Sequence, residues 1–196
     1  MKSNFLAMKG FNVLLKNCCD LYKINCDTTA GYNGRVFETT KSTGTLPFMG
    51  YGDPYHPATS GQLRGDIGDI EDDGTIPVLL TNGKNGEKIG RGDGYGGMGY
   101  KNGGAAIDIN RMDPNSPEHA DVLGHEMGHV GGYVVEDPSE AAPKEQYGPY
   151  HKKDPNPAAP HEDRPLMAPV GGGLVDKCWC EKVAKLSRPM PIIKVK

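Results

Sequence analysis

The sequence predicts a single α+β domain: a small twisted sheet, one central helix and an irregular carboxy-terminal part. The chain has 196 residues, a length that suits one domain with its own core. Residues 105–110 alternate apolar and polar side chains, as a half-buried strand does, and residues 115–132 follow with helical signals. The many prolines in residues 138–165 exclude long regular elements there.

The first half of the chain is expected to supply a helix and the sheet. Residues 1–30 form an amino-terminal helical extension, with a helix over residues 4–22. Residues 31–132 hold the sheet and the central helix. Residues 75–80 are the clearest strand before residues 105–110, and Asn-Gly turn sequences follow them. We expect the strand at residues 105–110 to run along the functional cleft and pair with an extended ligand.

The central helix has signals at both ends and an apolar stripe between them. Its start is expected at residues 115–118, where a capping side chain precedes proline and an acidic residue. Its stop is expected at Gly131 and Gly132. The core-facing stripe consists of Val122, Leu123, Met127 and Val130.

Residues 133–196 are expected to form a carboxy-terminal subdomain of the same domain. Residues 138–165 are a long proline-rich loop, which we expect to cover the functional site as a lid. A short helix is predicted over residues 175–186. The lysine-rich end, residues 192–196, is expected to trail away from the fold.

The central helix carries His-Glu-Met-Gly-His at residues 125–129, which matches the H-E-x-x-H motif of zinc peptidases. Residues four apart share one helix face, so His125 and His129 can bind a single Zn²⁺. Glu126 lies beside that face and can act as the general base on a zinc-bound water, whose pKa zinc lowers to about 7. Because the motif falls in mid-helix, its context favours a zinc site over a chance match.

The residues after the motif resemble the metzincin family of zincin-type metallopeptidases. Its signature is H-E-x-x-H-x-x-G-x-x-H, and four positions match: His125, Glu126, His129 and Gly132. The position of the last ligand is Val135, which cannot bind zinc. Leishmanolysin-like metzincins carry a long insertion at this point, and residues 133–160 resemble such an insertion. This resemblance implies a zincin-like fold and a zinc endopeptidase.

A second segment resembles the Met-turn of the matrixin branch. Residues 166–169 read Leu-Met-Ala-Pro, and the resemblance implies that Met167 lies beneath the zinc. Without the preceding motif, Met167 would be interpreted as a core methionine in a proline-rich loop.

A catalytic zinc takes three protein ligands and leaves a position for water, so a further ligand is required. His161 is the favoured prediction, because the resemblance places the last ligand just before the Met-turn. Glutamates would make a His₂Glu site, as in gluzincins and in zincin-like toxin domains of bacterial secretion systems. His151 is an alternative ligand, or a hydrogen-bond donor to the oxyanion of the reaction. The glutamates considered are Glu162, Glu140 and Glu145.

Five cysteines lie near the two ends of the chain, which suggests that disulfides hold these ends together. They are Cys18, Cys19, Cys26, Cys178 and Cys180. Their spacing matches no zinc-finger pattern, and the odd number leaves at least one free thiol. We expect one or two disulfides and therefore an oxidising destination.

Charge and hydropathy limit the classes of partner. The net charge is −3, with both signs interspersed, and no basic stripe accompanies aromatic residues, so nucleic-acid binding is not expected. No apolar run reaches the 18 or so residues of a membrane helix. The start does not continue as a signal peptide, so we expect the protein either to stay inside the cell or to be secreted or delivered without such a signal, and we favour the second. A structural Ca²⁺ site is a weaker hypothesis than a solvated acidic turn; it would involve Asp66, Asp69, Asp72 and Asp73.

Together these patterns predict a zinc-dependent endopeptidase that hydrolyses a protein or peptide substrate, with Glu126 as general base. A bacterial secreted effector or toxin is the hypothesis for its setting, with an inhibitor or immunity protein or a secretion-system carrier as partner. The alternative is a zincin-fold protein that binds zinc without peptidase activity. Structural zinc sites are closed and commonly cysteine-rich. The motif has no cysteine nearby and retains Glu126, which favours the enzyme.

Overall fold

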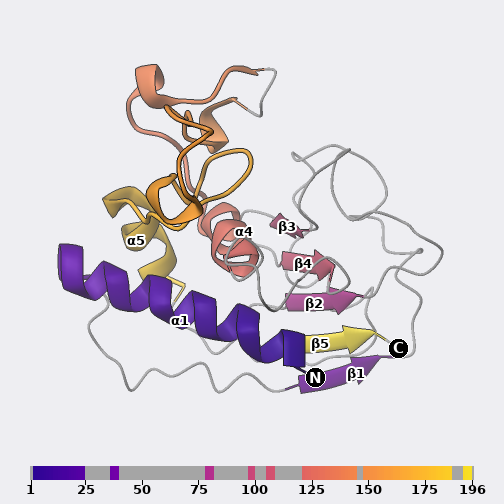
Figure 1. The fold of residues 1–196 in the computed structure, drawn as a ribbon. Helices are drawn as coiled ribbons and strands as arrows, with labels where there is room; N and C mark the ends of the chain where they lie inside the picture. Colours follow the sequence, from indigo (N-terminus) through magenta and orange to yellow (C-terminus); the bar gives the residue numbers. More distant parts are fainter. Residues whose placement is uncertain are drawn as a thin grey trace.

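The computed structural model describes residues 2–24, 36–39, 78–81, 97–99, 105–108, 121–144, 148–186 and 192–195. In this part of the chain, helices cover one face of a five-stranded sheet (Figure 1). The helices are α1 (Lys2–Tyr22), α4 (Val122–Val130) and α5 (Lys177–Ala184), and the 3₁₀ turns are η5 (Pro138–Glu140), η7 (Gly148–Tyr150) and η8 (His161–Asp163). The strands are β1 (Val36–Thr39), β2 (Val78–Thr81), β3 (Gly97–Gly99), β4 (Ala105–Asp108) and β5 (Ile192–Val195). Within the described ranges, no helix has both the length and the apolarity that crossing a membrane requires.

The strand order in the sheet is β1-β5-β2-β4-β3. Strands β1, β5, β2 and β4 run parallel to one another, and β3 pairs antiparallel with β4 at the end of the sheet. Ala106 of β4 therefore faces Leu79 of β2 on one side and Met98 of β3 on the other. The prediction that residues 105–110 line a cleft as an open edge is wrong for β4, because both of its edges are paired. The edge strand beside α4 is β3.

The last strand corrects a second expectation. The end of the chain, expected to trail away, instead forms β5 in the middle of the sheet. Ile193 pairs with Phe37 of β1 and with Leu79 of β2, parallel to both. The segment Ile-Ile-Lys-Val is rich in β-branched residues, which fit a pleated, half-buried surface. Strand propensity and a place between two parallel strands thus outweigh the lysines that suggested a solvated tail.

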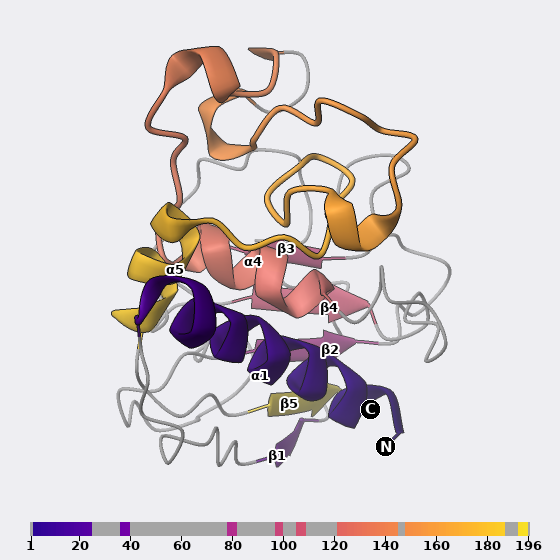
Figure 2. The same cartoon turned by 60° about the vertical axis from the view of Figure 1, so that its left-hand side comes forward.

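Helix α1 belongs to the core of the domain and is not a peripheral extension. Figure 2 shows α1 and α4 side by side across the same face of the sheet. Phe11 and Leu14 of α1 are fully buried, whereas Val13 of the same helix is exposed. Gly124 of α4 permits the close approach of the two helices, because a Cβ at this position would collide with Cδ1 of Leu14.

The apolar stripe predicted for the central helix is confirmed. Val122, Leu123, Met127 and Val130 of α4 are all buried. The helix ends as predicted, with Gly131 at the C-cap and Gly132 in the left-handed region at φ +74°. At the other end Asp121 is the N-cap, and the expected start at residues 115–118 lies outside the described residues.

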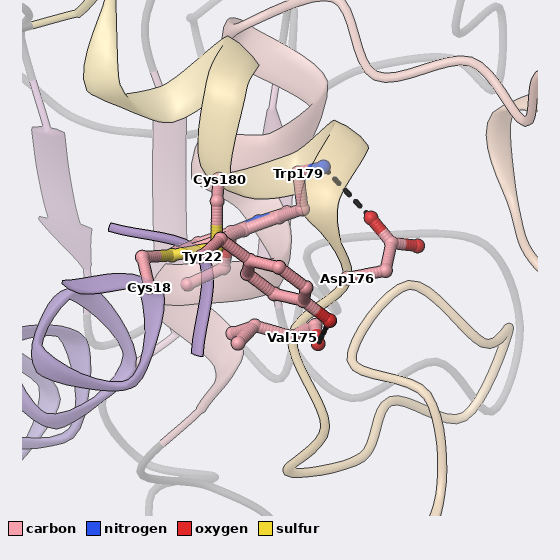
Figure 3. The surroundings of a disulfide bond; sticks show 7 residues. Cys18, Tyr22, Val175, Asp176, Trp179 and Cys180 are labelled. Carbon is pink, nitrogen blue, oxygen red and sulfur yellow. Dashed lines mark hydrogen bonds between the residues drawn. A yellow bond between two sulfur atoms is a disulfide. The ribbon is translucent and has the colours of Figure 1, made fainter. Parts of the chain in front are cut away.

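A disulfide between Cys18 of α1 and Cys180 of α5 joins the two ends of the chain (Figure 3), as the cysteine grouping predicted. The bridged residues are 162 positions apart. Cys19 is also disulfide-bonded. Cys178 carries a free thiol, and burial is the main cause that raises its pKa.

Trp179, which precedes the disulfide-bonded Cys180, connects α5 to α4 at Gly124. Its side chain is fully buried, and its Nε1 donates to the carbonyl of Gly124 at 3.0 Å. The backbone N–H of Trp179 donates to Oδ1 of Asp176 at 2.8 Å, which caps α5 (Figure 3). The hydroxyl of Tyr22 in α1 donates to the carbonyl of Val175 at 3.3 Å. The disulfide therefore lies where α1, α4 and α5 meet.

We expect Cys18→Ser to destabilise the protein by about 2–5 kcal/mol, because a cross-link over so long a stretch strongly restricts the unfolded chain. Urea unfolding followed by circular dichroism would measure the loss. Cys178→Ser is the matched control, since its thiol is free, and it should unfold like the wild type. Equal unfolding midpoints for Cys18→Ser and the control would contradict a stabilising role of the bridge.

Candidate metal centre

Three histidine side chains meet at one point of the structure. Nε2 of His125 lies 3.2 Å from Nε2 of His129 and 3.2 Å from Nε2 of His151. One ligand atom from each ring lies within 4.8 Å of the other two. Among the described residues this is the group of His, Cys, Asp and Glu side chains that could hold a metal ion. The two histidines of the helix motif are thus joined by a third from a distant segment.

Helix α4 positions the first two rings by its own geometry. His125 and His129 are four residues apart, so they lie on one face about one turn from each other. Their ring centroids are 4.9 Å apart. The apolar stripe of the same helix is buried in the core. Burial of that stripe therefore directs both imidazoles to the side where His151 lies.

A backbone carbonyl determines the tautomer of His125. Nδ1 of this ring lies 2.7 Å from the carbonyl oxygen of Leu166. A carbonyl can only accept a hydrogen bond, so Nδ1 carries the proton and donates. In the neutral ring Nε2 then keeps its lone pair, and that atom faces the other two histidines. Metal-binding histidines are typically held in this way through the second nitrogen.

The surroundings favour neutral imidazoles, which is the form that binds metals. Burial lowers the pKa of His125, although the bond to the Leu166 carbonyl opposes this effect. Burial, then the neighbouring rings of His125 and His151, lower the pKa of His129 well below its usual range. Burial, followed by His125, lowers the pKa of His151 to about 3. All three rings therefore present lone pairs at neutral pH.

His151 is held in place by backbone hydrogen bonds on both sides. Its carbonyl accepts from the N–H of Ala142 at 2.8 Å, and its own N–H donates to the carbonyl of Gly148 at 3.2 Å. The next residue, Lys152, donates its N–H to the carbonyl of Met167 at 2.8 Å, and its Nζ lies 3.0 Å from Oε2 of Glu140. The segment is irregular, as predicted, but these bonds fix the part that carries His151.

The favoured third ligand, His161, is not in the group. Its Nε2 instead donates to Oδ2 of Asp121 at 2.7 Å. This bond directs the ring to the start of α4, which explains why His161 does not join the group. His151, the lower-ranked alternative, occupies the third position. Because its Nε2 faces His125, the geometry favours a ligand over an oxyanion donor. The sequence could not identify His151 as the third member of the group, because no spacing rule connects it with His129, 22 residues earlier.

Of the proposed glutamate ligands, the two that the structure describes, Glu140 and Glu162, do not join the histidine group. Glu140 is exposed and forms its ion pair with Lys152. Glu162 is exposed on η8. Glu145 lies outside the described residues, as do the four aspartates of the calcium hypothesis, Asp66, Asp69, Asp72 and Asp73.

Met167 packs against α4 at the glycine inside the motif. It is fully buried, and a Cβ at Gly128 would lie 2.5 Å from its Sδ and 2.8 Å from Cδ1 of Trp179. Gly128 therefore allows both large side chains to approach the helix between the two histidines. The turn itself is closed by the N–H of Ala168, which donates to the carbonyl of Pro165 at 3.0 Å.

Glu126 follows His125 in α4, and its side chain is enclosed between that helix and β3. It is buried, and a Cβ at Gly97 would lie 2.7 Å from its Oε1. A Cβ at Gly99 would collide with the backbone carbonyl oxygen of Glu126. Gly97 and Gly99 therefore permit the close approach of β3 and α4. This role of the two glycines appears only when the strand and the helix are packed together.

The environment of Glu126 gives its carboxyl a high affinity for protons. Burial raises its pKa to about 8, while a backbone hydrogen bond involving Gly99 acts in the opposite direction. Carboxyls that serve as general bases near neutral pH are tuned in this direction by burial. The three imidazoles are therefore neutral, and α4, which supplies two of them, also carries the buried carboxyl of Glu126.

No protein-family model matches this chain, and no curated protein or solved structure matches it either. The function is therefore inferred from the geometry of the site.

Proposed function

We propose that this protein is a zinc-dependent endopeptidase. His125, His129 and His151 hold the metal, and Glu126 is the general base. The observation that carries the proposal is the convergence of three imidazole nitrogens, 3.2 Å apart in two pairs, two of them from the helix that also carries the buried Glu126. Two nitrogens bound to tetrahedral zinc at 2.0–2.1 Å are separated by about 3.3 Å. Two of the three nitrogen pairs therefore already have the separation that a bound zinc ion requires.

The ligand set is that of a hydrolytic site. Three protein ligands with an open fourth position are typical of catalytic zinc, whereas structural zinc is closed by four. The histidine group supplies three in the described part of the chain. When bound, zinc polarises a carbonyl and lowers the pKa of water to about 7.

The chain's own residues would perform the proton transfers and hold the geometry. The Glu126 carboxylate accepts the proton that the attacking water loses, and it passes that proton to the nitrogen of the leaving amine. The carbonyl of Leu166 holds His125 in the tautomer that leaves Nε2 free. The close packing of Glu126 against β3 limits the positions that its carboxyl can take.

The place of β3 supports a peptide as the substrate. Among the described strands it is the last one at its end of the sheet, and it contacts Glu126 through Gly97 and Gly99. Extended peptides bind to proteins by adding a strand to such an edge. A peptide bound along β3 would bring its backbone carbonyls close to Glu126. The Cys18–Cys180 disulfide supports an oxidising destination, in keeping with a secreted protein.

Metal removal and reconstitution test the proposal. The purified protein is expected to bind one zinc ion per chain and to cleave an unfolded protein substrate such as casein. A chelator should abolish cleavage, and one equivalent of zinc should restore it. Digestion that persists in the chelator would contradict a zinc mechanism. Binding of one zinc without cleavage under any condition would instead support the non-catalytic zinc-binding alternative.

A further inference from the structure

Residues 161–174, here called the platform segment, are folded into one unit by their own backbone hydrogen bonds. The N–H of Gly173 donates to the carbonyl of His161 at 2.9 Å, and the N–H of Leu174 donates to that of Arg164 at 3.0 Å. The N–H of Leu166 donates back to the carbonyl of Leu174 at 2.7 Å. Gly172 permits this folding, because a Cβ there would collide with the Arg164 carbonyl oxygen.

The platform segment contacts the metal centre from two successive carbonyls. The carbonyl of Leu166 accepts from Nδ1 of His125, and the carbonyl of Met167 accepts from the N–H of Lys152, next to His151. The first contact orients a ligand of α4. The second ties the loop that carries the third ligand. The platform segment therefore determines the position of His151 relative to α4.

A buried side-chain pair attaches the platform segment to the start of α4. Nε2 of His161 donates to Oδ2 of Asp121 at 2.7 Å, and the two side chains are only 6% and 16% exposed. Nδ1 of His161 is buried without a hydrogen-bond partner among the described residues. The carbonyl of Asp121 accepts from the N–H of His125 at 2.9 Å. The helix and the platform segment are thus joined at Asp121 and, one turn later, at His125.

We infer that His161 and Asp121 are positioning residues of the metal centre, which hold the platform segment so that His151 can complete the ligand set. This inference rests on the metal site of the proposed function and goes beyond it. Helix α4 places His125 and His129 by itself, but His151 comes from another segment. The Asp121 hydrogen bond gives the platform segment a second polar attachment to α4, in addition to the His125–Leu166 bond and the packing of Met167 against Gly128. Hydrogen bonds that hold ligands from outside the coordination shell contribute about 10–100-fold to metal affinity.

Zinc affinity, measured by competition with a chromogenic chelator, tests this inference. His161→Ala is expected to weaken zinc binding about 10–100-fold. His161→Gln should remain close to the wild type, because its Nε2 can still donate to Asp121. Asp163→Ala, an exposed neighbour on η8, is the matched control and should bind zinc like the wild type. Wild-type affinity in His161→Ala, or an equal loss in His161→Gln, would overturn the inference.

A double variant separates positioning from a general loss of stability. If His161 acts through His151, then His161→Ala should cause no further loss of zinc affinity in a His151→Ala background. Additive losses would show that the pair acts otherwise and would overturn the inference. If His161→Ala does not fold, Asp121→Asn carries the same test, since its amide keeps the packing and weakens the hydrogen bond; wild-type affinity in Asp121→Asn would count against the pair.

Amide exchange in the metal-free protein distinguishes failure of the inference from failure of the proposed function. The Lys152 amide, bonded to the Met167 carbonyl, should exchange faster by NMR in His161→Ala than in the wild type and Asp163→Ala. A wild type that binds no zinc would refute the proposed function, while faster Lys152 exchange would still show that the pair holds the His151 segment. Unchanged exchange in His161→Ala would overturn the inference even if zinc binds.

Discussion

Glu126→Gln is expected to lower kcat/KM for peptide hydrolysis about 10²–10⁴-fold, the usual contribution of a general base. The amide has nearly the shape of the carboxyl, so it should keep the packing of Glu126 against Gly97 and Gly99. It cannot accept a proton from the attacking water. Because Glu126 is not in the histidine group, the variant should still bind one zinc ion per chain. Rates on a fluorogenic peptide library, together with zinc content, would measure both effects.

Controls separate chemistry from folding in this experiment. Glu136→Gln makes the same chemical change at an exposed position and should retain wild-type activity. Glu126→Ala should be as inactive as Glu126→Gln, although it also leaves space beside β3. If either variant of Glu126 cleaved at the wild-type rate, Glu126 would not be the base. If Glu126→Gln lost zinc as well as activity, the assignment of ligand and base roles would need revision.

His151→Ala is expected to lower zinc affinity by a factor on the order of 10²–10³, because the site would keep only two of its three ligands. Structural zinc sites with four ligands bind with about 10–16 kcal/mol, so one ligand corresponds to several kcal/mol. The loss should exceed that of His161→Ala, whose ring bonds to Asp121 outside the group. Isothermal titration of the metal-free protein with zinc would give the two affinities.

The comparison between the two histidines decides the third ligand. Wild-type zinc affinity in His151→Ala, with a larger loss in His161→Ala, would restore His161 as the ligand that the sequence favoured. Glu162→Ala is the further control, because this exposed glutamate was the alternative next to His161. It should bind zinc like the wild type. Cobalt substitution would add an optical measure of how many imidazoles coordinate the metal.

Local patterns predicted those parts of the fold that depend on neighbouring residues. The apolar stripe and the end of α4 follow from helical periodicity and from two glycines, and the structure confirms both. The link between the ends of the chain followed from where the cysteines lie, and the Cys18–Cys180 disulfide makes it. The position of β5 could not be predicted in this way. A four-residue strand has little local signal, and its partners β1 and β2 are more than 100 residues away in sequence.

The sequence by itself determined the half of the metal centre that one helix supplies. The spacing of His125 and His129 and the place of Glu126 follow from helix geometry, which depends on neighbouring residues alone. Only the tertiary structure decided which other histidine joins them. His151 and His161 both lie in the segment after the helix, and their chemistry is the same. The choice depends on where the chain folds back: the Met167 carbonyl fixes the segment of His151, while Asp121 binds the ring of His161.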